Sequence, residues 1–162
     1  MDTISSQVFS AQHPSDLLER IIADEASQSQ HDGVYRISRS GVCNRDAFLC
    51  TVLENSQTIP VNNRDAYLAQ MQTNYDVDDW STSCWNDFER TIELYSLMLK
   101  RIDSPKILKG NILPQTGYSI ITTNRPSIKS LPMKKQRKRA HHIDWWIFES
   151  QDVSIYFEEV EV

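Results

Sequence analysis

The change in residue pattern along the chain is the feature that most constrains its fold. Apolar residues recur at helical spacing early, as at Leu17, Leu18 and Ile21, whereas β-branched runs broken by Gly and Pro fill residues 106–123. Helices that come mostly early and strands that come mostly late are typical of α+β proteins rather than of alternating βαβ units. We therefore predict an α+β fold, with N-terminal helices followed by a mainly antiparallel, strand-rich C-terminal half.

Local patterns give the expected elements. Two similar segments, NRDAFLC and NRDAYLA, each place a capping Asn before an aromatic-Leu pair and predict two helix starts. The segment after Asn86 shows the clearest helical periodicity, with Glu89 in a capping arrangement. Helices are expected at 15–26 and from residues 44, 63 and 86; strands are expected at 34–39, 76–85, 141–150 and 153–162.

The length of 162 residues fits one domain with a substantial core. We predict a flexible N-terminus at 1–13 and a single α+β domain at 14–162, with a basic loop at about 124–140 that carries two prolines. The three cysteines form neither an even disulfide set nor a CxxC metal pair, which favours a reducing compartment and no structural zinc.

The N-terminal segment lacks the basic start and apolar core of a secretory signal, and no apolar run approaches membrane-spanning length. We expect a protein without membrane association, located in the cytoplasm. The Ser- and Gln-rich start also suits the leader of an effector that is secreted into a target cell.

Charge is unevenly distributed around the net value of −5. Residues 1–33 hold six acids against one arginine, whereas the run KKQRKR at 134–139 is almost entirely basic. This run suits contact with nucleic acid, with an acidic partner or with the acidic N-terminus, or it forms a solvated loop. It contains no aromatic residue, so recognition of single strands by base stacking is not supported.

Three separated motifs suggest a chemistry. Arg36 lies in the predicted strand YRISR, a Ser-Thr-Ser triplet follows about 45 residues later, and Glu-x-Glu ends the chain. Carboxylates at i and i+2 on a strand share one face, so they can act on one ligand. This order of motifs resembles the mono-ADP-ribosyltransferases of the arginine-serine-glutamate class, which includes many bacterial toxins. The triplet comprises Ser81, Thr82 and Ser83, and the acidic pair is Glu159 and Glu161.

The resemblance implies an enzyme that uses NAD to modify a protein side chain, an arginine where Glu159 is present. Glu161 is then expected to stabilise the positive charge that develops on the ribose when nicotinamide leaves. Glu159 is expected to orient or deprotonate the acceptor, and Arg36 to bind an NAD phosphate. Ser81 is expected to position the catalytic Glu and the ribose, and Thr82 and Ser83 to complete the wall on which nicotinamide lies.

Other interpretations of these segments remain open. The C-terminal glutamates also suit a solvated acidic end. Val153, Ile155 and Phe157 have the same strand parity as Glu159 and Glu161, so a bulge near Glu158 would be needed to turn the glutamates away from the apolar face. The segment HHIDWWIFE suits a core-packing strand, but His142 and Asp144 share one of its faces and suit acid-base chemistry or phosphodiester cleavage.

A non-enzymatic immunity or adaptor module that binds partners through the Trp-rich strand is the main alternative to the transferase. Metal binding is not expected, because no third His or Cys lies at ligand spacing from His141 and His142. Cys84 has no base near it in the sequence, and we expect a packed thiol there.

Overall fold

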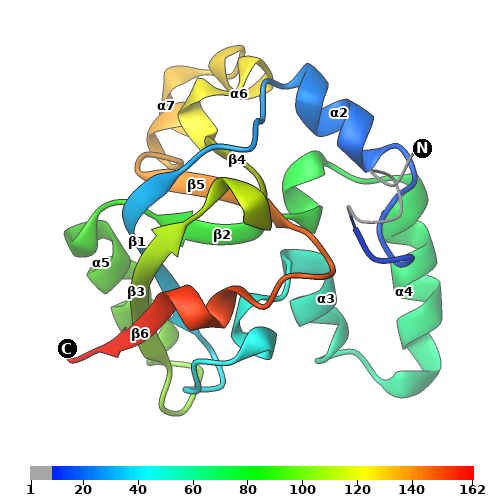
Figure 1. The fold of residues 1–162 in the computed structure, drawn as a ribbon. Coiled ribbons are helices and arrows are strands. Elements are labelled where there is room, and N and C mark those ends of the chain that lie inside the picture. The colour runs from blue at the N-terminus through cyan, green and yellow to red at the C-terminus, as the bar shows by residue number, and fades with distance from the viewer. Residues whose placement is uncertain (1–8) are drawn as a thin grey trace.

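The computed structural model describes residues 9–162, and Figure 1 shows the arrangement of their helices and strands. The helices are α2 Leu17–Ala23, α3 Thr51–Ser56, α4 Val61–Thr73, α5 Phe88–Met98, α6 Pro126–Lys129 and α7 Met133–Arg137. The strands are β1 His31–Ser38, β2 Thr82–Trp85, β3 Lys106–Ile112, β4 Gly117–Ile121, β5 His142–Ile147 and β6 Phe157–Val160. Most of the helical residues lie in the first half and most strands in the second, which confirms the predicted α+β class.

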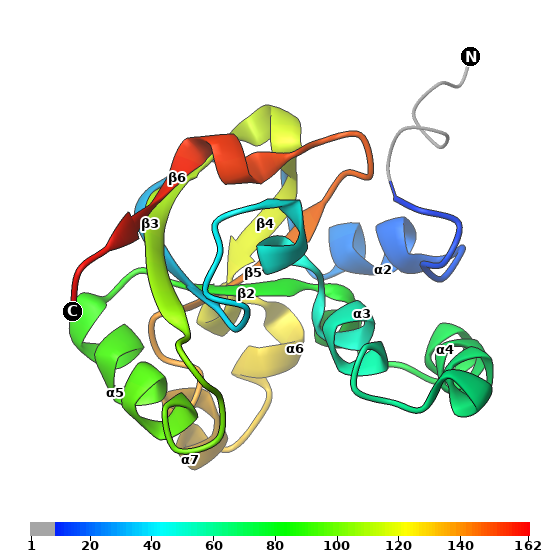
Figure 2. The ribbon, with the colours of Figure 1, turned by 90° about the horizontal axis from the view of Figure 1, so that it is seen from below.

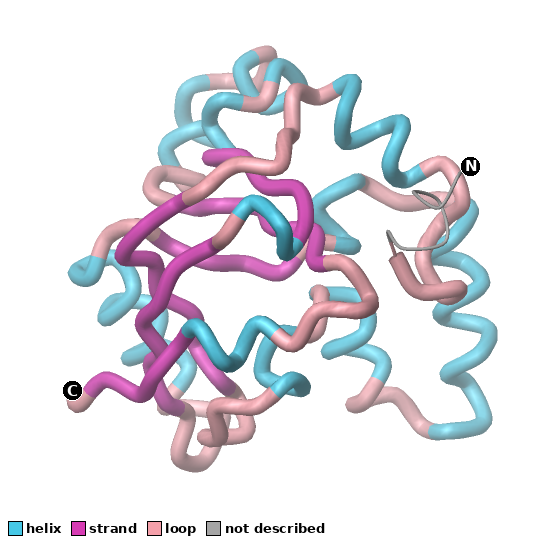
Figure 3. Tube along the Cα trace, in the orientation of Figure 1, coloured by secondary structure: helices cyan, strands magenta, loops and turns pink. Residues whose placement is uncertain are grey.

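Within residues 9–162 the strands form one six-stranded sheet in the order β4-β5-β2-β1-β3-β6, and every neighbouring pair is antiparallel. Figure 3 shows these strands as a single curved layer with the helices around it. In the β2–β5 pair, Ser83 lies opposite Asp144 and Trp85 lies opposite His142. The order makes β2 and β5 direct neighbours and places β1 and β3 between β2 and β6.

The core has two parts, because successive side chains of β5 point to opposite faces of the sheet. Trp146 packs with Leu17, Val52 and Trp80 in one cluster, whereas Trp145 packs with other side chains in the second cluster. Figure 2 shows α5, α6 and α7 on the same side of β2 and β5. The predicted packing of the tryptophan strand is confirmed, since Trp145 and Trp146 are almost fully buried.

The two similar NRDA segments do not form two equivalent helix starts. Asn44 does cap, accepting from the backbone N–H of Ala47, but the turn that follows is a short 3-10 helix at Arg45–Phe48. The second copy lies inside α4, which starts at Val61 immediately after Pro60. Proline fixes the backbone just ahead of the helix, and α4 therefore begins two residues before the predicted capping Asn.

Four other predictions need correction. The expected strand at 76–85 begins only at Thr82, because Val77–Trp80 form a 3-10 helix with a capping box at Asp76. The expected loop at 124–140 contains α6 and α7, and Pro126 occupies the first helical position of α6, where its missing N–H costs nothing. Asp87, not Asn86, caps α5. The expected strand at 153–162 begins only at Phe157, because Asp152 accepts from Ser154 N–H and starts a 3-10 turn.

Residues 9–13, which precede α2, pack on the domain. Phe9 stacks on His13 with ring centroids 5.4 Å apart, and His13 contacts Trp80 at 4.7 Å. Of the segment 1–13 that is predicted to be flexible, residues 9–13 thus include side chains that pack on one another and on Trp80, and residues 1–8 lie outside the described residues. Within 9–162, none of the helices combines the length and apolar character that crossing a membrane requires.

Candidate functional site

Arg36 is positioned on β1, but its side chain is buried and engaged within the protein. Its guanidinium donates to the backbone carbonyls of Ala47, Ser83 and Leu49 at 2.9, 3.0 and 3.4 Å. It also pairs with the Glu54 carboxylate at 3.2 Å. These four interactions connect β1 to β2 and to the segment before α3, so Arg36 holds the sheet together and offers no free fork of donors to a phosphate.

The Ser-Thr-Ser triplet is divided between the two faces of the sheet. Thr82 donates to the Phe48 carbonyl at 2.8 Å on one face and is buried there. Ser81 and Ser83 have the opposite parity and lie on the other face, next to Asp144 of β5. Only the two serines can therefore contribute to one site.

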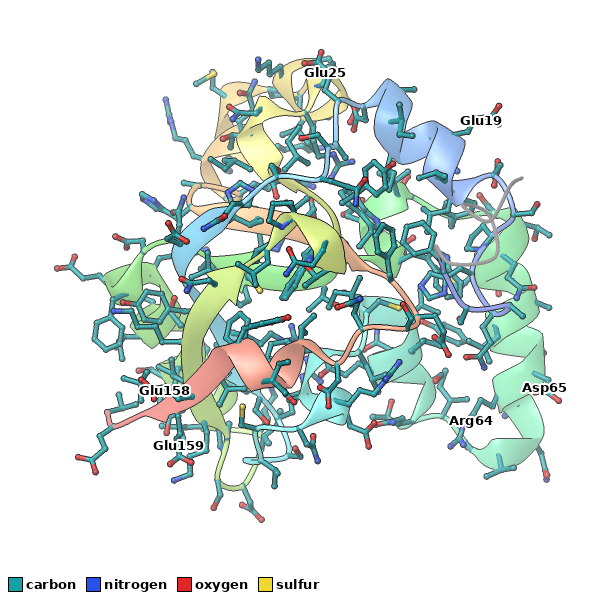
Figure 4. All side chains as sticks on the ribbon, viewed as in Figure 1. Glu19, Glu25, Arg64, Asp65, Glu158 and Glu159 are labelled. Atoms are coloured by element: carbon teal, nitrogen blue, oxygen red, sulfur yellow. The ribbon has the colours of Figure 1, made fainter. Side chains whose placement is uncertain are left out.

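The two C-terminal glutamates lie apart from the serines. Glu159 is on the edge strand β6, where it pairs with Lys106 at 3.6 Å, and half of its side chain is exposed. Glu161 follows the end of β6 and is exposed. Figure 4 shows Glu158 and Glu159 at the outer end of β6. The structure does not bring these glutamates to Ser81, because β1 and β3 lie between β2 and β6.

The carboxylate that does meet Ser81 belongs to Asp144, which is fully buried. Its Oδ1 accepts from the Ser81 hydroxyl at 2.9 Å, across 63 residues of sequence, and this hydroxyl proton is shared with the Asp78 backbone carbonyl at 3.0 Å. Its Oδ2 accepts from the Thr122 hydroxyl at 2.9 Å and from Arg125 Nη1 at 2.8 Å. Arg125 is itself buried and also pairs with Asp24 at 2.8 Å. Hydrogen bonds and an opposite charge compensate the buried carboxylate, as ionised groups in a protein interior require.

His142 joins this group through Thr122, whose hydroxyl oxygen lies 2.6 Å from the His142 Nδ1. We call Ser81, Thr122, Arg125, His142 and Asp144 the Asp144 cluster. Burial lowers the pKa of His142 below its usual value, and the nearby Asp144 carboxylate only partly offsets this effect. The imidazole is therefore neutral near pH 7 and available for proton transfer.

Three members of the cluster, Thr122, His142 and Asp144, line a cavity of about 380 Å³ on the face of β2 and β5. A second cavity, of about 510 Å³, adjoins the first, and both are lined by Asp78 and Arg139. We call the first the β2–β5 cavity. Its lining comprises hydroxyl groups, acids, two cations and one imidazole: Thr51, Ser83, Thr122, Asp78, Asp79, Asp144, Lys138, Arg139 and His142.

Asp78 gives the β2–β5 cavity a second perturbed group. Burial, and then the charge of Asp144, raises the pKa of the Asp78 carboxyl. A raised carboxyl pKa and a lowered imidazole pKa in one cavity suit acid-base chemistry, because the carboxyl holds its proton to higher pH than usual while the imidazole remains an unprotonated base to lower pH than usual. In the described part of the chain, no three His, Cys, Asp or Glu side chains gather into a metal site.

Sequence reasoning identified His142 and Asp144 but missed Thr122, Arg125 and Asp78. The sequence does indicate that Asp144 needs a partner, because it is the single acid within the apolar run HIDWWI and a buried carboxylate requires a positive partner. The sequence does not say which of the seventeen lysines and arginines that partner is.

Comparison with protein-family models, with curated proteins and with solved structures finds no match to this chain. The residues of the β2–β5 cavity therefore carry the functional conclusion.

Proposed function

We propose that this protein is an NAD-dependent mono-ADP-ribosyltransferase that modifies a protein side chain, and that its reaction centre is the β2–β5 cavity. Asp144 replaces Glu161 as the carboxylate of this centre; because it is buried and already paired, it acts on the ribose through its charge rather than by direct contact. The observation that carries the proposal is the 2.9 Å hydrogen bond from Ser81 to Asp144, which joins the Ser-Thr-Ser strand to a carboxylate. The resemblance requires a serine that positions a carboxylate, and on this sheet the serine meets Asp144.

The chemistry needs negative potential where nicotinamide leaves the ribose. The C–N bond breaks with its electron pair going to nicotinamide, and positive charge develops on the sugar. Asp144 is held in place by three hydrogen-bond donors, so its carboxylate needs no reorganisation during the reaction. Arg125 reduces the net charge at this point, and the Asp78 and Asp79 carboxyls of the same cavity add to the negative potential.

The paired cavities suit a ligand with two halves. In a dinucleotide, two nucleosides are joined through a diphosphate, and Arg139 lines both cavities at their shared boundary. Because Arg36 is engaged internally, we assign the diphosphate to Arg139, with Lys138 beside it. Ser83 is the member of the triplet that lines the β2–β5 cavity, and it is the expected contact for the nicotinamide riboside.

Calorimetry with NAD tests the proposal, together with an assay for nicotinamide release in the presence of candidate acceptor proteins. Loss of one charge-assisted contact costs about 1.5–3 kcal/mol, so Arg139→Gln is expected to weaken NAD binding by about ten- to a hundredfold. Arg137→Gln is the matched control, because Arg137 lies on α7 and does not line the cavity. No binding of NAD by the wild-type protein, or equal effects of the two substitutions, would count against the proposal.

Phosphodiester cleavage is a second candidate, and the position of His142 favours it. A neutral imidazole beside Lys138 and Arg139 combines a base with cations that suit a phosphate. The basic run at 134–139 leads to the same cavity, so a nucleic-acid strand is the expected substrate in this case. Cleavage of RNA that is lost in His142→Ala, with no turnover of NAD, would replace the transferase by a nuclease.

A binding module that uses the tryptophan strand is not favoured, because Trp145 and Trp146 are buried and cannot form a binding surface.

A further inference from the structure

We infer that His142 is held in a single tautomer by Thr122 and that its Nε2 is the base that deprotonates the acceptor. This inference rests on the proposed transferase function and gives His142 the role that the sequence resemblance assigned to Glu159. It names a group that touches the reacting atoms on the acceptor side, whereas Asp144 acts on the ribose side.

The tautomer follows from counting protons on three atoms. The Thr122 hydroxyl has one proton, and its oxygen lies 2.9 Å from Asp144 Oδ2 and 2.6 Å from His142 Nδ1. Asp144 Oδ2 already accepts from the cationic Arg125 at 2.8 Å, so it is also the acceptor in its contact with Thr122. Thr122 therefore donates to Asp144 and must accept from His142, which places the imidazole proton on Nδ1 and leaves a lone pair on Nε2.

The surroundings leave Nε2 available. Among the described residues no hydrogen bond engages Nε2, and it is not a buried atom without a partner, so it is accessible; the His142 side chain is one of those that line the β2–β5 cavity. Trp85 packs edge-on against the imidazole with ring centroids 5.5 Å apart and fixes the plane of the ring. The structure thus presents a fixed base toward the space in which the ligand is expected.

Several charged groups face the imidazole. Asp144 and Asp78 favour its protonated form, whereas Arg125 and Arg139 disfavour it, and burial disfavours it most. Lys138 adds a further positive charge to the cavity lining. The balance keeps the imidazole neutral over most of the physiological pH range.

The step is a balanced transfer. The acceptor atom uses a lone pair to form a bond to the ribose carbon as nicotinamide departs with the electrons of its C–N bond. Nε2 takes the proton of the acceptor, and the imidazolium that results later returns this proton to water. No metal, oxidant or reductant takes part.

Nuclear magnetic resonance of protein labelled with ¹⁵N in histidine tests the geometry without any ligand, because protonated and unprotonated ring nitrogens have distinct shifts. The expected result at neutral pH is a protonated Nδ1 and an unprotonated Nε2 in His142. In Thr122→Val the preference is expected to be lost, and in Thr122→Ser it is expected to return. An Nε2-protonated ring in the wild-type protein would overturn the inference, whatever the activity.

Kinetics test the catalytic role separately. The side-chain amide of His142→Asn preserves donation to Thr122 but removes Nε2, so the rate of transfer is expected to fall by about 10²–10⁴-fold. The wild-type rate is expected to fall as pH drops through the His142 pKa, below 6.5, and this decline should be absent in the variant. His141→Asn is the matched control, because His141 is exposed and has a positive φ, which Asn tolerates.

The two proposals fail in different ways. Transfer that is unchanged in His142→Asn would overturn the role of His142 and leave the transferase function intact. Absence of NAD turnover in the wild-type protein would overturn the function, and with it the catalytic role inferred here.

Discussion

Replacement of Asp144 by Asn is expected to destabilise the protein strongly. Asp144 is fully buried and accepts three hydrogen bonds, one of them from the buried Arg125. Removal of one partner of a buried ion pair typically costs about 3–5 kcal/mol, because the remaining charge is left without compensation. Arg125 retains Asp24 at 2.8 Å, so we expect a cost near the lower limit, about 3 kcal/mol.

Urea unfolding followed by tryptophan fluorescence measures this cost, since Trp145 and Trp146 directly follow Asp144 in the sequence and are buried. The expected result is a lower urea concentration at the unfolding midpoint, with an unchanged slope of the unfolding free energy against urea concentration. Glu161→Gln is the control, because an exposed carboxylate at the chain end is expected to change stability by less than about 0.5 kcal/mol.

A cost below about 1 kcal/mol for Asp144→Asn would refute the reasoning, because a loss so small is typical of an exposed pair. The double variant with Arg125→Met gives a second test. If the two charges compensate each other, the double variant should be more stable than the sum of the two single losses predicts. Additive losses would show that Asp144 and Arg125 do not interact as the structure has them.

Other predictions concern groups outside the cavity. Burial lowers the pKa of His13 to about 4, so the free energy of unfolding should fall by up to about 3 kcal/mol as pH drops from 6.5 toward 4. In acid titrations followed by circular dichroism, His13→Gln should remove this pH dependence. Burial raises the pKa values of Cys50 and Cys84 to about 12, so both should react with thiol reagents at pH 8 only after unfolding; rapid labelling of the native protein would contradict this. Gly110→Ala should cost about 1–3 kcal/mol in urea unfolding, because the added Cβ would meet the Tyr156 backbone oxygen just before β6 and the Phe157 ring. An unchanged urea midpoint would contradict this close approach.

The class of the fold could be predicted from the sequence because periodicity is local information. The helical spacing at 17–22 and the alternation in HIDWWI are visible within single windows. Strand order is not local. It depends on which strands pair across long loops, and it is this order that separates β6 from β2.

In the candidate site, too, local features could be predicted from the sequence and contacts between distant segments could not. His142 and Asp144 could be placed on one face of a strand from their spacing alone. The role of Arg36 could not be read, because its acceptors are mainly backbone carbonyls, which every residue type provides. Glu161 was expected on a strand, but the chain forms a 3-10 turn at Val153–Tyr156 and the strand that follows ends at Val160.

Release of nicotinamide from NAD by Ser81→Ala and Glu161→Gln, measured beside the wild-type protein at equal folded concentration, tests the central claim most directly. Ser81→Ala is expected to lose most of the activity, because Asp144 then loses one of the three donors that position it, while Glu161→Gln is expected to retain the wild-type rate. Loss of activity in Glu161→Gln with retention in Ser81→Ala would contradict the assignment of the reaction centre to the β2–β5 cavity.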